Sequence, residues 1–423
     1  MSLDGRTVVV GLTGGIACYK ACEVVRLLVG AGARVRVVMT AGAREFVSPL
    51  TLQTLSGQPV ATDTFRLTEE SEIGHIRLAD AAEAVVIAPA TANLLAKAAS
   101  GIADDLLTTV LLATRAPVIL APAMNVHMWE HPAVQENLAR LVARGARVVG
   151  PASGFLACGY EGAGRLADPE DIVEVVRRTL APRDLEGERL LITAGPTQEP
   201  IDPVRYLSNH SSGKMGYALA RVARRRGAEV TLVSGPTALT PPPGVRAVQV
   251  RTAREMGRAV DEAFSGATAV IMTAAVADYR PCQPLSRKLK KDAASLTLEL
   301  ERNADILGGL AARKGGQVLI GFAAETHDVA AEARRKLQAK RLDLIVANDV
   351  TAPGAGFGSD TNVVRLIDRA GLDETLPVLP KEEVAGRILD WLAAHRAQAA
   401  ATLRPVPAPA ARRRSRRSSG RGA

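Results

Sequence analysis

The chain repeats one short pattern, first at its start and again near its middle. In each copy an apolar run, residues 7–12 or 190–193, is followed by a turn that contains glycine, and a helical pattern comes later. Apolar runs of this kind are typical of parallel strands that are buried on both faces. A strand, a glycine turn and a helix together direct backbone N–H groups and a helix dipole toward an anion. The repeat therefore predicts two α/β units in tandem, each with a turn suited to a phosphate.

The composition is that of an ordinary water-soluble protein, with 47% hydrophobic and 23% charged residues among 423, enough for two or three domains. No apolar run approaches the ~20 residues that a membrane-spanning helix needs. The first ten residues lack the basic region and apolar core of a signal peptide. Four cysteines without a CxxC pair predict no disulfide framework. We therefore expect a cytoplasmic protein with no membrane partner.

The net charge of +9 belongs largely to the C-terminal tail. Residues 404–423 contain seven arginines and no acidic residue, so the rest of the chain is close to neutral. A segment of such low complexity cannot bury a core, so we expect residues 399–423 to form a disordered, Arg-rich tail. The charge therefore predicts a solvated appendage rather than a specific nucleic-acid site.

The first half alternates predicted strands with amphipathic runs, which favours a doubly wound parallel sheet with ligands at the carboxyl ends of its strands. Gly11 to Gly15 do not form the GxGxxG pattern of a dinucleotide fold. The second strand ends at Thr40, where an NAD site would place an acidic residue. A hydroxyl suits a phosphate monoester better, and this favours flavin mononucleotide. The predicted strands are 7–12, 34–39, 84–88, 117–121 and 147–149.

Two Pro-Ala turns and a glycine-rich segment are further candidates for the predicted flavin site. The turns, residues 88–93 and 121–125, each deliver a small polar residue at a predicted strand end, although ordinary helix caps would explain either turn alone. Residues 150–165 contain five glycines around Cys158. This composition makes a poor strand and a poor helix, so we expect a mobile flap that excludes water from the reaction.

The second half begins after a short polar boundary, residues 181–187, that is broken by a proline. Its Gly213-Lys214 pair resembles part of a P-loop, but Ser208 stands where that motif needs glycine and Met215 where it needs a hydroxyl. A P-loop NTPase is therefore rejected. Three lysines within residues 288–291, and two more spaced four residues apart on a predicted helix, suit nucleotide phosphates. For the helical pair considered alone, a solvated face is the better explanation. The predicted strands are 189–193, 229–233, 269–273, 317–321 and 342–346.

Long motifs in a fixed order connect the chain with known enzymes. Gly14-Gly15, Gly74-His75-Ile76, Pro122-Ala123-Met124-Asn125 and Ala157-Cys158-Gly159 resemble the flavin-dependent cysteine decarboxylases. Thr193-Ala194-Gly195-Pro196-Thr197 and the run from Ser208 to Gly216 resemble phosphopantothenate–cysteine ligase. Together, over about residues 5–395, the chain resembles the bacterial bifunctional proteins of coenzyme A biosynthesis.

For the first half, the resemblance implies an FMN-dependent phosphopantothenoylcysteine decarboxylase. His75 would be the active-site base, Asn125 would hold the substrate carboxylate, and Cys158 would be the acid that returns a proton. The flap departs from the family pattern directly after Ala-Cys-Gly: an acid is usual there, but this chain has Tyr160, followed by Glu161. This departure leaves the hydrogen bonding of the flap open. The residues expected to bind FMN are Gly14, Gly15, Thr40, Thr91 and Asn93.

For the second half, the resemblance implies a ligase that activates 4'-phosphopantothenate with CTP as an acyl-cytidylate, which cysteine then attacks to give phosphopantothenoylcysteine. Arg205 and Asn209 would handle the acyl-cytidylate, and Mg²⁺ with lysines would stabilise the leaving group; the Mg²⁺ ligands stay unassigned. Ala304 replaces the proline that is usual in the family. The residues expected to bind CTP are Asp278, Lys288, Asn303, Ala304, Asp305, Ile306, Phe322, Lys336 and Lys340.

The sequence thus predicts an α/β protein with two doubly wound, Rossmann-like parallel-sheet domains. Residues 1–186 would form a flavodoxin-like decarboxylase domain and residues 187–398 a ligase domain. The resemblance also implies a homo-oligomer, with trimers or dodecamers through the first domain and dimers through the second. Two other interpretations stay open: a regulatory binding protein with the flavin fold, and a decarboxylase that acts on peptide cysteines.

Overall fold

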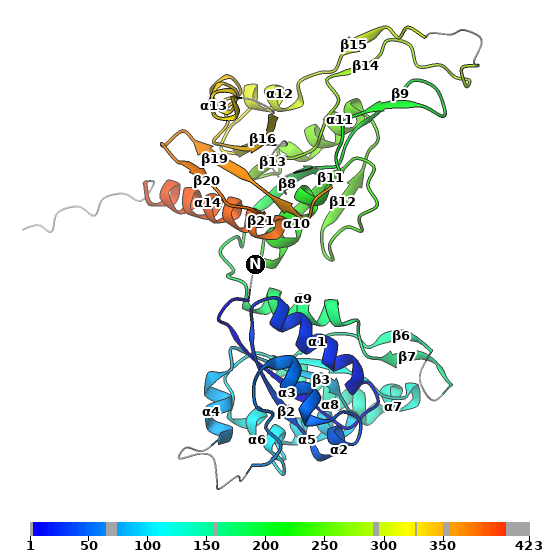
Figure 1. Ribbon diagram of the computed structural model, residues 1–423, viewed down its shortest axis with the longest axis vertical. Coiled ribbons are helices and arrows are strands. Elements are labelled where there is room, and N and C mark those ends of the chain that lie inside the picture. The colour runs from blue at the N-terminus through cyan, green and yellow to red at the C-terminus, as the bar shows by residue number, and fades with distance from the viewer. Residues whose placement is uncertain are drawn as a thin grey trace, which may run out of the picture.

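The protein is described from a computed structural model, which covers residues 3–64, 74–155, 159–290, 296–325, 328–349, 356 and 358–402. Figure 1 shows two lobes, each built on its own sheet and joined by the segment after helix α9 (Pro169–Leu180). Within the described residues, no helix is both long and apolar enough to cross a membrane.

The N-terminal lobe is built on a sheet of five parallel strands, each beginning within a residue of its predicted start. Its buried strands carry runs such as Val8 to Leu12, which are covered by helices on both faces. Because β1 lies beside both β2 and β3, the order reverses between β1 and β3, and this is the flavodoxin-like order. Across the sheet the strands are β2 (Arg34–Met39), β1 (Thr7–Leu12), β3 (Ala84–Ala90), β4 (Val118–Pro122) and β5 (Arg147–Val148).

Helices cover both faces of this sheet, and each layer of helices closes its own core. One layer consists of α1 (Cys18–Gly30), α3 (Pro49–Ser56) and α9, packed on residues such as Val10 and Val86. The other layer consists of α4 (Gly74–Ala81), α5 (Ala92–Ser100), α6 (Leu106–Ala113) and α8 (Pro132–Ala143). Cys18 is buried and Cys22 is partly buried in the first layer, as expected for helix packing.

The glycine-rich segment differs from the expectation that it makes a poor strand. It forms an antiparallel hairpin of β6 (Ala152–Phe155) and β7 (Glu161–Arg165), whose tip, with Cys158, lies outside the described residues. The glycines explain the difference, because a side chain on Gly162 would lie 2.9 Å from the Val126 side chain. The ribbon therefore needs glycine to lie close to α7 (Val126–Glu130).

The C-terminal lobe is built on a sheet of eight strands, six parallel and two antiparallel at one edge. The order reverses between β8 and β13, so this sheet is also doubly wound. The antiparallel strands were not predicted. Across the sheet lie β12 (Arg246–Gln249), β11 (Glu229–Ser234), β8 (Arg189–Ala194), β13 (Ala269–Met272), β16 (Val318–Glu325), β17 (Leu344–Asp349), β19 (Val364–Asp368) and β20 (Asp373–Thr375).

Helices again cover both faces. On one face α10 (Lys214–Arg225) packs against α14 (Lys381–Thr402), and the other face carries α11 (Ala253–Phe264), α12 (Ile306–Ala312) and α13 (Val329–Ala339). Helix α14 continues past residue 398, where the ligase domain was expected to end, and the tail from residue 403 lies outside the described residues. The boundary between residues 186 and 187 falls in the segment that joins α9 to β8 and stays a prediction.

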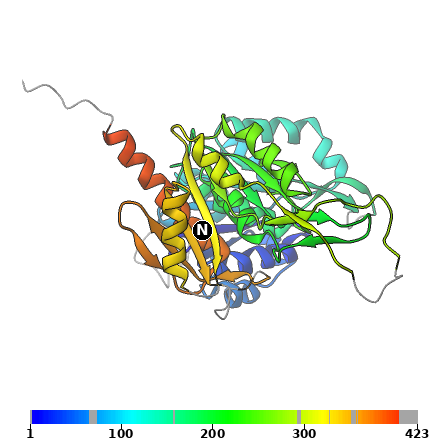
Figure 2. The same ribbon diagram turned by 90° about the horizontal axis from the view of Figure 1, so that it is seen from above.

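An arm of short strands extends from the C-terminal lobe, opposite to α14 (Figures 1 and 2). Its two ribbons are joined by a hydrogen bond from the N–H of Leu285 to the carbonyl of Ile201 at 2.9 Å. The arm therefore brings together two parts of the chain that are about eighty residues apart. The strands of the arm are β9 (Gln198–Pro200), β10 (Tyr206–Ser208), β14 (Tyr279–Pro281) and β15 (Leu300–Arg302).

Candidate functional sites

The first candidate site is a cavity of about 950 Å³ at the carboxyl ends of β1, β3 and β4. Ligands of open α/β sheets bind at the point where the strand order reverses, and this cavity includes that point. The sequence-predicted residues that line it are Gly14, Gly15, Thr40, Thr91, Asn93 and Asn125. Sequence reasoning missed Lys20 in α1 and Arg165 in the hairpin, which also line it.

Small residues form a close backbone contact on one wall of this cavity. An added Cβ on Gly14 would lie 3.0 Å from the Cα and carbonyl carbon of Gly42. Gly15 has more room, with Thr91 Cγ2 at 3.6 Å from such a Cβ. Gly14 is thus required for the turn after β1 to pack against the start of α2 (Ala41–Arg44), while Gly15 leaves open space on the cavity side.

Threonine hydroxyls cap two of the helices that begin at this cavity, α2 and α5. Thr40 Oγ1 accepts a hydrogen bond from the N–H of Ala43 at 3.3 Å, and Thr91 Oγ1 accepts one from Leu94 at 3.4 Å. Thr13 Oγ1 donates to the Pro89 carbonyl at 2.6 Å and accepts from the N–H of Thr91 at 3.1 Å, which fixes the turn after β1 to the end of β3. The site thus offers hydroxyls and helix N-terminal N–H groups, the donors that a phosphate needs.

Asn125 is the N-cap of α7, and its Oδ1 accepts a hydrogen bond from the N–H of His127 at 2.8 Å. The hairpin is held beside this helix: the N–H of Met124 donates to the Gly164 carbonyl at 2.9 Å, and Tyr160 packs edge-on against His127 with ring centroids 5.2 Å apart. Tyr160, where the flap departs from the family pattern, therefore makes an aromatic contact with α7.

For two predicted residues of this site, the structure does not confirm the prediction. His75 lies in the first turn of α4 and is not among the described residues that line the cavity. Its Nδ1 is buried without a hydrogen-bond partner among the described residues. Cys158 lies outside the described residues, so its position relative to Asn125 stays a prediction.

The second candidate site is a cavity of about 920 Å³ at the carboxyl ends of β13, β16 and β17 and at the start of α10. It includes the point where the order of the C-terminal sheet reverses. The sequence-predicted residues that line it are Asn209, Asp278, Asn303, Ala304, Asp305, Ile306, Phe322, Lys336 and Lys340. The substitution of proline by Ala304 does not disturb α12, because Asp305 caps this helix by accepting from the N–H of Gly308 at 3.0 Å.

Polar groups around this cavity are held by hydrogen bonds. Asn209 Nδ2 donates to the Val276 carbonyl at 3.0 Å, and Asn303 Nδ2 donates to the Ala277 carbonyl at 2.8 Å. Lys340 Nζ lies 2.9 Å from Asp305 Oδ1. Burial would raise the pKa of Asp305, but its hydrogen bonds with Gly308 and Lys340 outweigh burial and lower this pKa. Asp305 is therefore an ionised partner for Lys340 at neutral pH.

Two lysines of this cavity were missed by sequence reasoning. Lys214 begins α10, and its Nζ lies 2.7 Å from Asp360 Oδ1. Lys381 begins α14, is 8% exposed and donates from Nζ to the Ser359 carbonyl. Burial, and secondarily Lys214, lowers the pKa of Lys381. The two lysines are far apart in sequence, and only the fold brings both to the cavity.

Arg205 and Lys288 are not among the described residues that line the cavity; they lie on the arm. Arg205 binds Asp202, whose side chain is fully buried, with Nη2 at 2.6 Å from Oδ2, and also donates to the Leu289 carbonyl at 2.9 Å. Burial would raise the pKa of Asp202, but N–H donors, including those of Val204 and Arg205, outweigh it and hold this pKa well below its usual range. Asp202 and Arg205 thus fix the segment that carries Lys288.

The comparisons with known proteins divide the chain in two. Residues 1–181 match the family model described as Flavoprotein, and residues 185–395 match the C-terminal domain of the DNA/pantothenate metabolism flavoproteins. The chain is 51% identical to the coenzyme A biosynthesis bifunctional protein CoaBC of Bacillus subtilis, over 93% of this chain and 98% of that protein.

Two further comparisons cover the same regions. The CoaBC protein of Escherichia coli strain K12 is 48% identical over 92% of this chain and 97% of its own length. The crystal structure of a C-terminal domain of CoaBC is 47% identical, with a TM-score of 0.45, and covers 51% of this chain and 99% of its own. On the identities to the two full-length CoaBC proteins, over nearly the full length of both chains, the protein belongs to the family of coenzyme A biosynthesis bifunctional proteins.

Proposed function

We propose that the chain catalyses two consecutive reactions, one in each cavity. The C-terminal cavity joins 4'-phosphopantothenate to cysteine with CTP, through an acyl-cytidylate, and releases pyrophosphate and then CMP. The N-terminal cavity removes CO2 from the resulting phosphopantothenoylcysteine and gives 4'-phosphopantetheine. The observation that carries this proposal is the presence of two separate cavities, each lined by most of the site residues that the sequence predicts for one reaction.

The N-terminal cavity fits FMN in size and donor chemistry. Thr40 and Thr91 offer hydroxyls, two helix N-termini offer N–H groups, and Gly15 leaves room for close approach. When bound, FMN supplies a reversible acceptor for two electrons. The purified protein is therefore expected to be yellow, and denaturation is expected to release FMN; a colourless protein that fails to bind added FMN would contradict this assignment.

The residues of the N-terminal site have distinct roles in this proposal. The net reaction replaces a bond to carboxylate with a bond to hydrogen, so the site must orient the carboxylate and supply one proton. The Asn125 amide at the cavity wall is suited to hold the carboxylate. Cys158 is the proposed proton donor, because a thiol with a reference pKa of about 8.5 is a far better acid than a hydroxyl. His75 is the proposed base.

The C-terminal cavity is suited to anionic substrates. Lys214, Lys336, Lys340 and Lys381 line it; Asp305 pairs with Lys340, and Asp360 pairs with Lys214. Preorganised cations stabilise the charge that develops on a phosphate leaving group. Asn209 is proposed to act on the acyl-cytidylate. Release of pyrophosphate that requires CTP and phosphopantothenate, but not cysteine, tests this half; equal release with no nucleotide specificity would contradict the choice of CTP.

Mg²⁺ is proposed to enter with the nucleotide. Among the described residues there is no group of three or more His, Cys, Asp or Glu side chains that could hold a metal ion. Mg²⁺ usually keeps several waters and binds through substrate phosphates and one or two carboxylates, so such a group is not needed. Chelation by EDTA is expected to stop pyrophosphate release and leave decarboxylation of supplied phosphopantothenoylcysteine unchanged.

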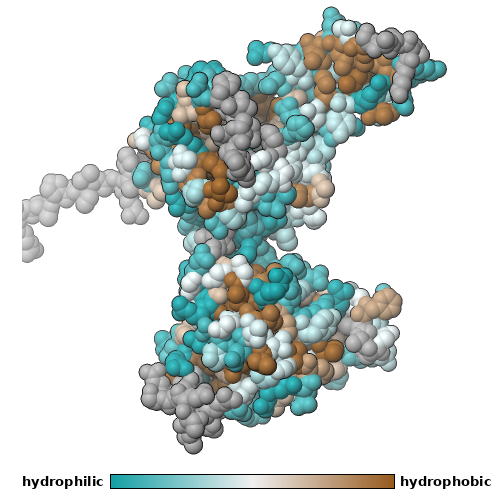
Figure 3. Space-filling model, in the orientation of Figure 1, coloured by the Kyte–Doolittle hydropathy of each residue, from teal (hydrophilic) through white to brown (hydrophobic). Residues whose placement is uncertain are grey.

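We further propose that the chain works as a homo-oligomer, with trimers or dodecamers through the N-terminal domain and dimers through the C-terminal domain. We propose an oligomer because His75, Arg205 and Lys288 do not line the cavities of a single chain. The arm also exposes large apolar and aromatic side chains, among them Val204, Tyr206, Tyr279, Leu285 and Leu300. Figure 3 shows a brown, hydrophobic area on the arm at the upper right. Sedimentation of a monomer at working concentration would contradict it.

A further inference from the structure

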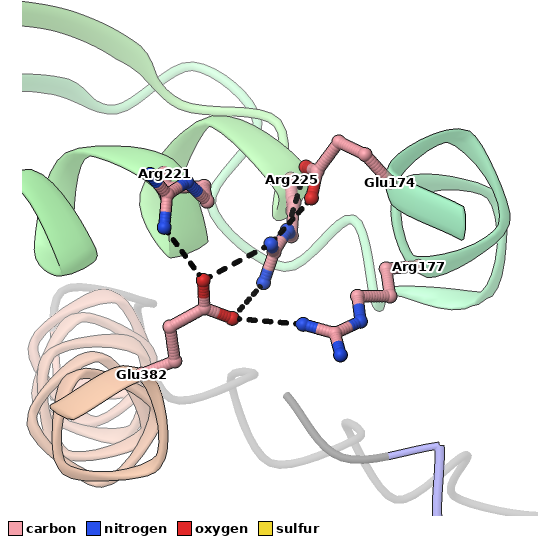
Figure 4. A network of polar contacts seen from close by, with 5 residues as sticks. All are labelled: Glu174, Arg177, Arg221, Arg225 and Glu382. Atoms are coloured by element: carbon pink, nitrogen blue, oxygen red, sulfur yellow. Dashed lines mark hydrogen bonds and ion pairs between the residues drawn. The ribbon is translucent and has the colours of Figure 1, made fainter. Parts of the chain in front are cut away.

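A compact network of ion pairs joins the two domains (Figure 4). Glu382, in the first turn of α14, accepts from three arginines: Arg221 and Arg225 of α10 at 2.8 and 2.6 Å, and Arg177 of α9 at 3.1 Å. Arg225 also donates to Glu174 of α9, with Nε at 2.7 Å from Oε1. A single carboxylate of the C-terminal domain is thus held by arginines of both domains.

Two arginines in and beside this network are buried, so each depends on its carboxylate partners. The side chain of Arg225 is only 2% exposed, and it is bound on one side by Glu174 and on the other by Glu382. A buried charge that loses one of its partners is costly, so Arg225 requires both carboxylates in place. Arg226 repeats the arrangement, with a 1% exposed side chain between Asp184 of the joining segment and Asp390 of α14. The helices α9, α10 and α14 are therefore fastened in one relative position.

The same two helices of the C-terminal domain also build its cavity. Lys381 directly precedes Glu382, and its N–H donates to the Asp360 carbonyl at 2.9 Å. Lys214 lies at the opposite end of α10 from Arg225 and pairs with the Asp360 side chain. Both lysines line the cavity. Because a helix is stiff, fixing Arg225 and Glu382 also fixes the lysines at the starts of α10 and α14.

We propose that Glu382 is a positioning residue for the ligation reaction, and that Arg177 makes this positioning depend on the docked N-terminal domain. The inference rests on the proposed function of the C-terminal cavity. Glu382 is not among the described residues that line the cavity. Its contacts hold Lys381 at the cavity wall in the orientation that binds an anionic substrate. The flavin domain thereby contributes to the ligase site through α9, without lining it.

The Arg177→Gln variant of the full chain tests this inference. Arg177 lies outside the ligase domain and donates one hydrogen bond to Glu382, so its loss does not threaten the fold of the ligase. We expect the KM for phosphopantothenate, for CTP or for both in pyrophosphate release to rise about threefold to tenfold, the effect of one charge-assisted hydrogen bond. The kcat is expected to stay within about twofold, and decarboxylation of supplied phosphopantothenoylcysteine to stay unchanged.

Three further variants distinguish an effect on the position of Lys381 from a general weakening of the contact between the domains. Arg177→Lys is expected to restore the KM, since one ammonium can replace a single hydrogen bond. Arg178→Gln, the same change at the exposed next position of α9, is expected to match wild type. Glu382→Gln is expected to raise the KM further than Arg177→Gln does. Unchanged KM values in both Arg177→Gln and Glu382→Gln would overturn the inference, whereas a wild-type chain without CTP-dependent pyrophosphate release would overturn the proposed function itself.

Discussion

The contact between α10 and β8 leads to a prediction that separates two glycines of the same domain. Replacing Gly216 with alanine would place a methyl carbon 2.5 Å from Ala194 Cβ, 2.6 Å from Thr273 Oγ1 and 2.9 Å from the Thr193 carbonyl oxygen. Ala194 has no rotamer to change, and the Thr193 oxygen is backbone of a central strand. None of these neighbours moves easily, so the helix itself must shift away from the sheet.

The size of the effect follows from two opposing terms. Overpacking a core costs about 1–3 kcal/mol, and rigid neighbours place this site at the upper end. Alanine in place of glycine in a helix returns about 1 kcal/mol. The Gly216→Ala variant is therefore expected to lose about 2 kcal/mol of unfolding free energy. Gly257, inside α11, is the matched control: its added Cβ would meet Ile306 at 3.7 Å, an ordinary contact, so Gly257→Ala is expected to gain about 0.5–1 kcal/mol.

Urea unfolding of the full chain measures this difference. The chain has two tryptophans, Trp129 in α7 and Trp391 in α14, so a Trp129→Phe background makes fluorescence report the C-terminal domain. The shift of α10 is also expected to displace Lys214 and to reduce pyrophosphate release while decarboxylation of supplied substrate persists. If Gly216→Ala proves as stable as Gly257→Ala, the close packing of α10 on β8 is wrong.

Three other changes give independent tests. Burial would raise the pKa of Glu382, but hydrogen bonds from Arg225 and Arg221 lower it from 4.5 to about 2. Ionised Glu382 therefore stabilises the chain by about 3 kcal/mol above pH 4.5. The difference in unfolding free energy between wild type and Glu382→Gln, measured by urea unfolding, should shrink as the pH falls from 4.5 toward 2. A difference that does not depend on pH would refute this. Gly14→Ala, whose Cβ would meet Gly42 at 3.0 Å, is expected to weaken FMN binding in a fluorescence titration at least about tenfold, an effect of about 1.4 kcal/mol, while Gly30→Ala, with open space around it, leaves binding unchanged. Cys158→Ser is expected to release CO2 in a single turnover but to form no 4'-phosphopantetheine, as mass spectrometry would show; normal turnover would mean that Cys158 is not the acid.

The regular parts of both sheets were predictable because buried parallel strands produce uninterrupted apolar runs. The runs at 84–88 and 269–273, for example, correspond to β3 and β13. The hairpin of β6 and β7 was not predicted. Its Gly162 lies so close to Val126 that a larger residue would clash, and composition alone does not reveal this contact. The edge strands β19 and β20 are short, and their pairing depends on β17, which lies earlier in the chain.

The candidate sites were predictable where a motif lies at a strand end. The residues that directly follow β1, β3 and β13 lie at the carboxyl ends of these strands, where the cavities are. For this reason the sequence could assign Gly14, Thr91 and Asp278 to the sites. Lys381 was not predictable, because it enters the cavity through the pairing of β18 (Thr361–Asn362) with β21 (Leu379–Pro380) just before α14. No local pattern announces this contact between distant segments.

The most direct test of the two consecutive reactions is a single-vessel assay of the purified full chain. The chain is incubated with 4'-phosphopantothenate, cysteine, CTP and Mg²⁺, and the products are followed by mass spectrometry. We predict 4'-phosphopantetheine, with one CMP, one pyrophosphate and one CO2 for each molecule formed. Omission of CTP should abolish the product, and supplied phosphopantothenoylcysteine should restore it. Phosphopantothenoylcysteine that accumulates without loss of CO2, or product that forms without CTP, would contradict the assignment of the two cavities.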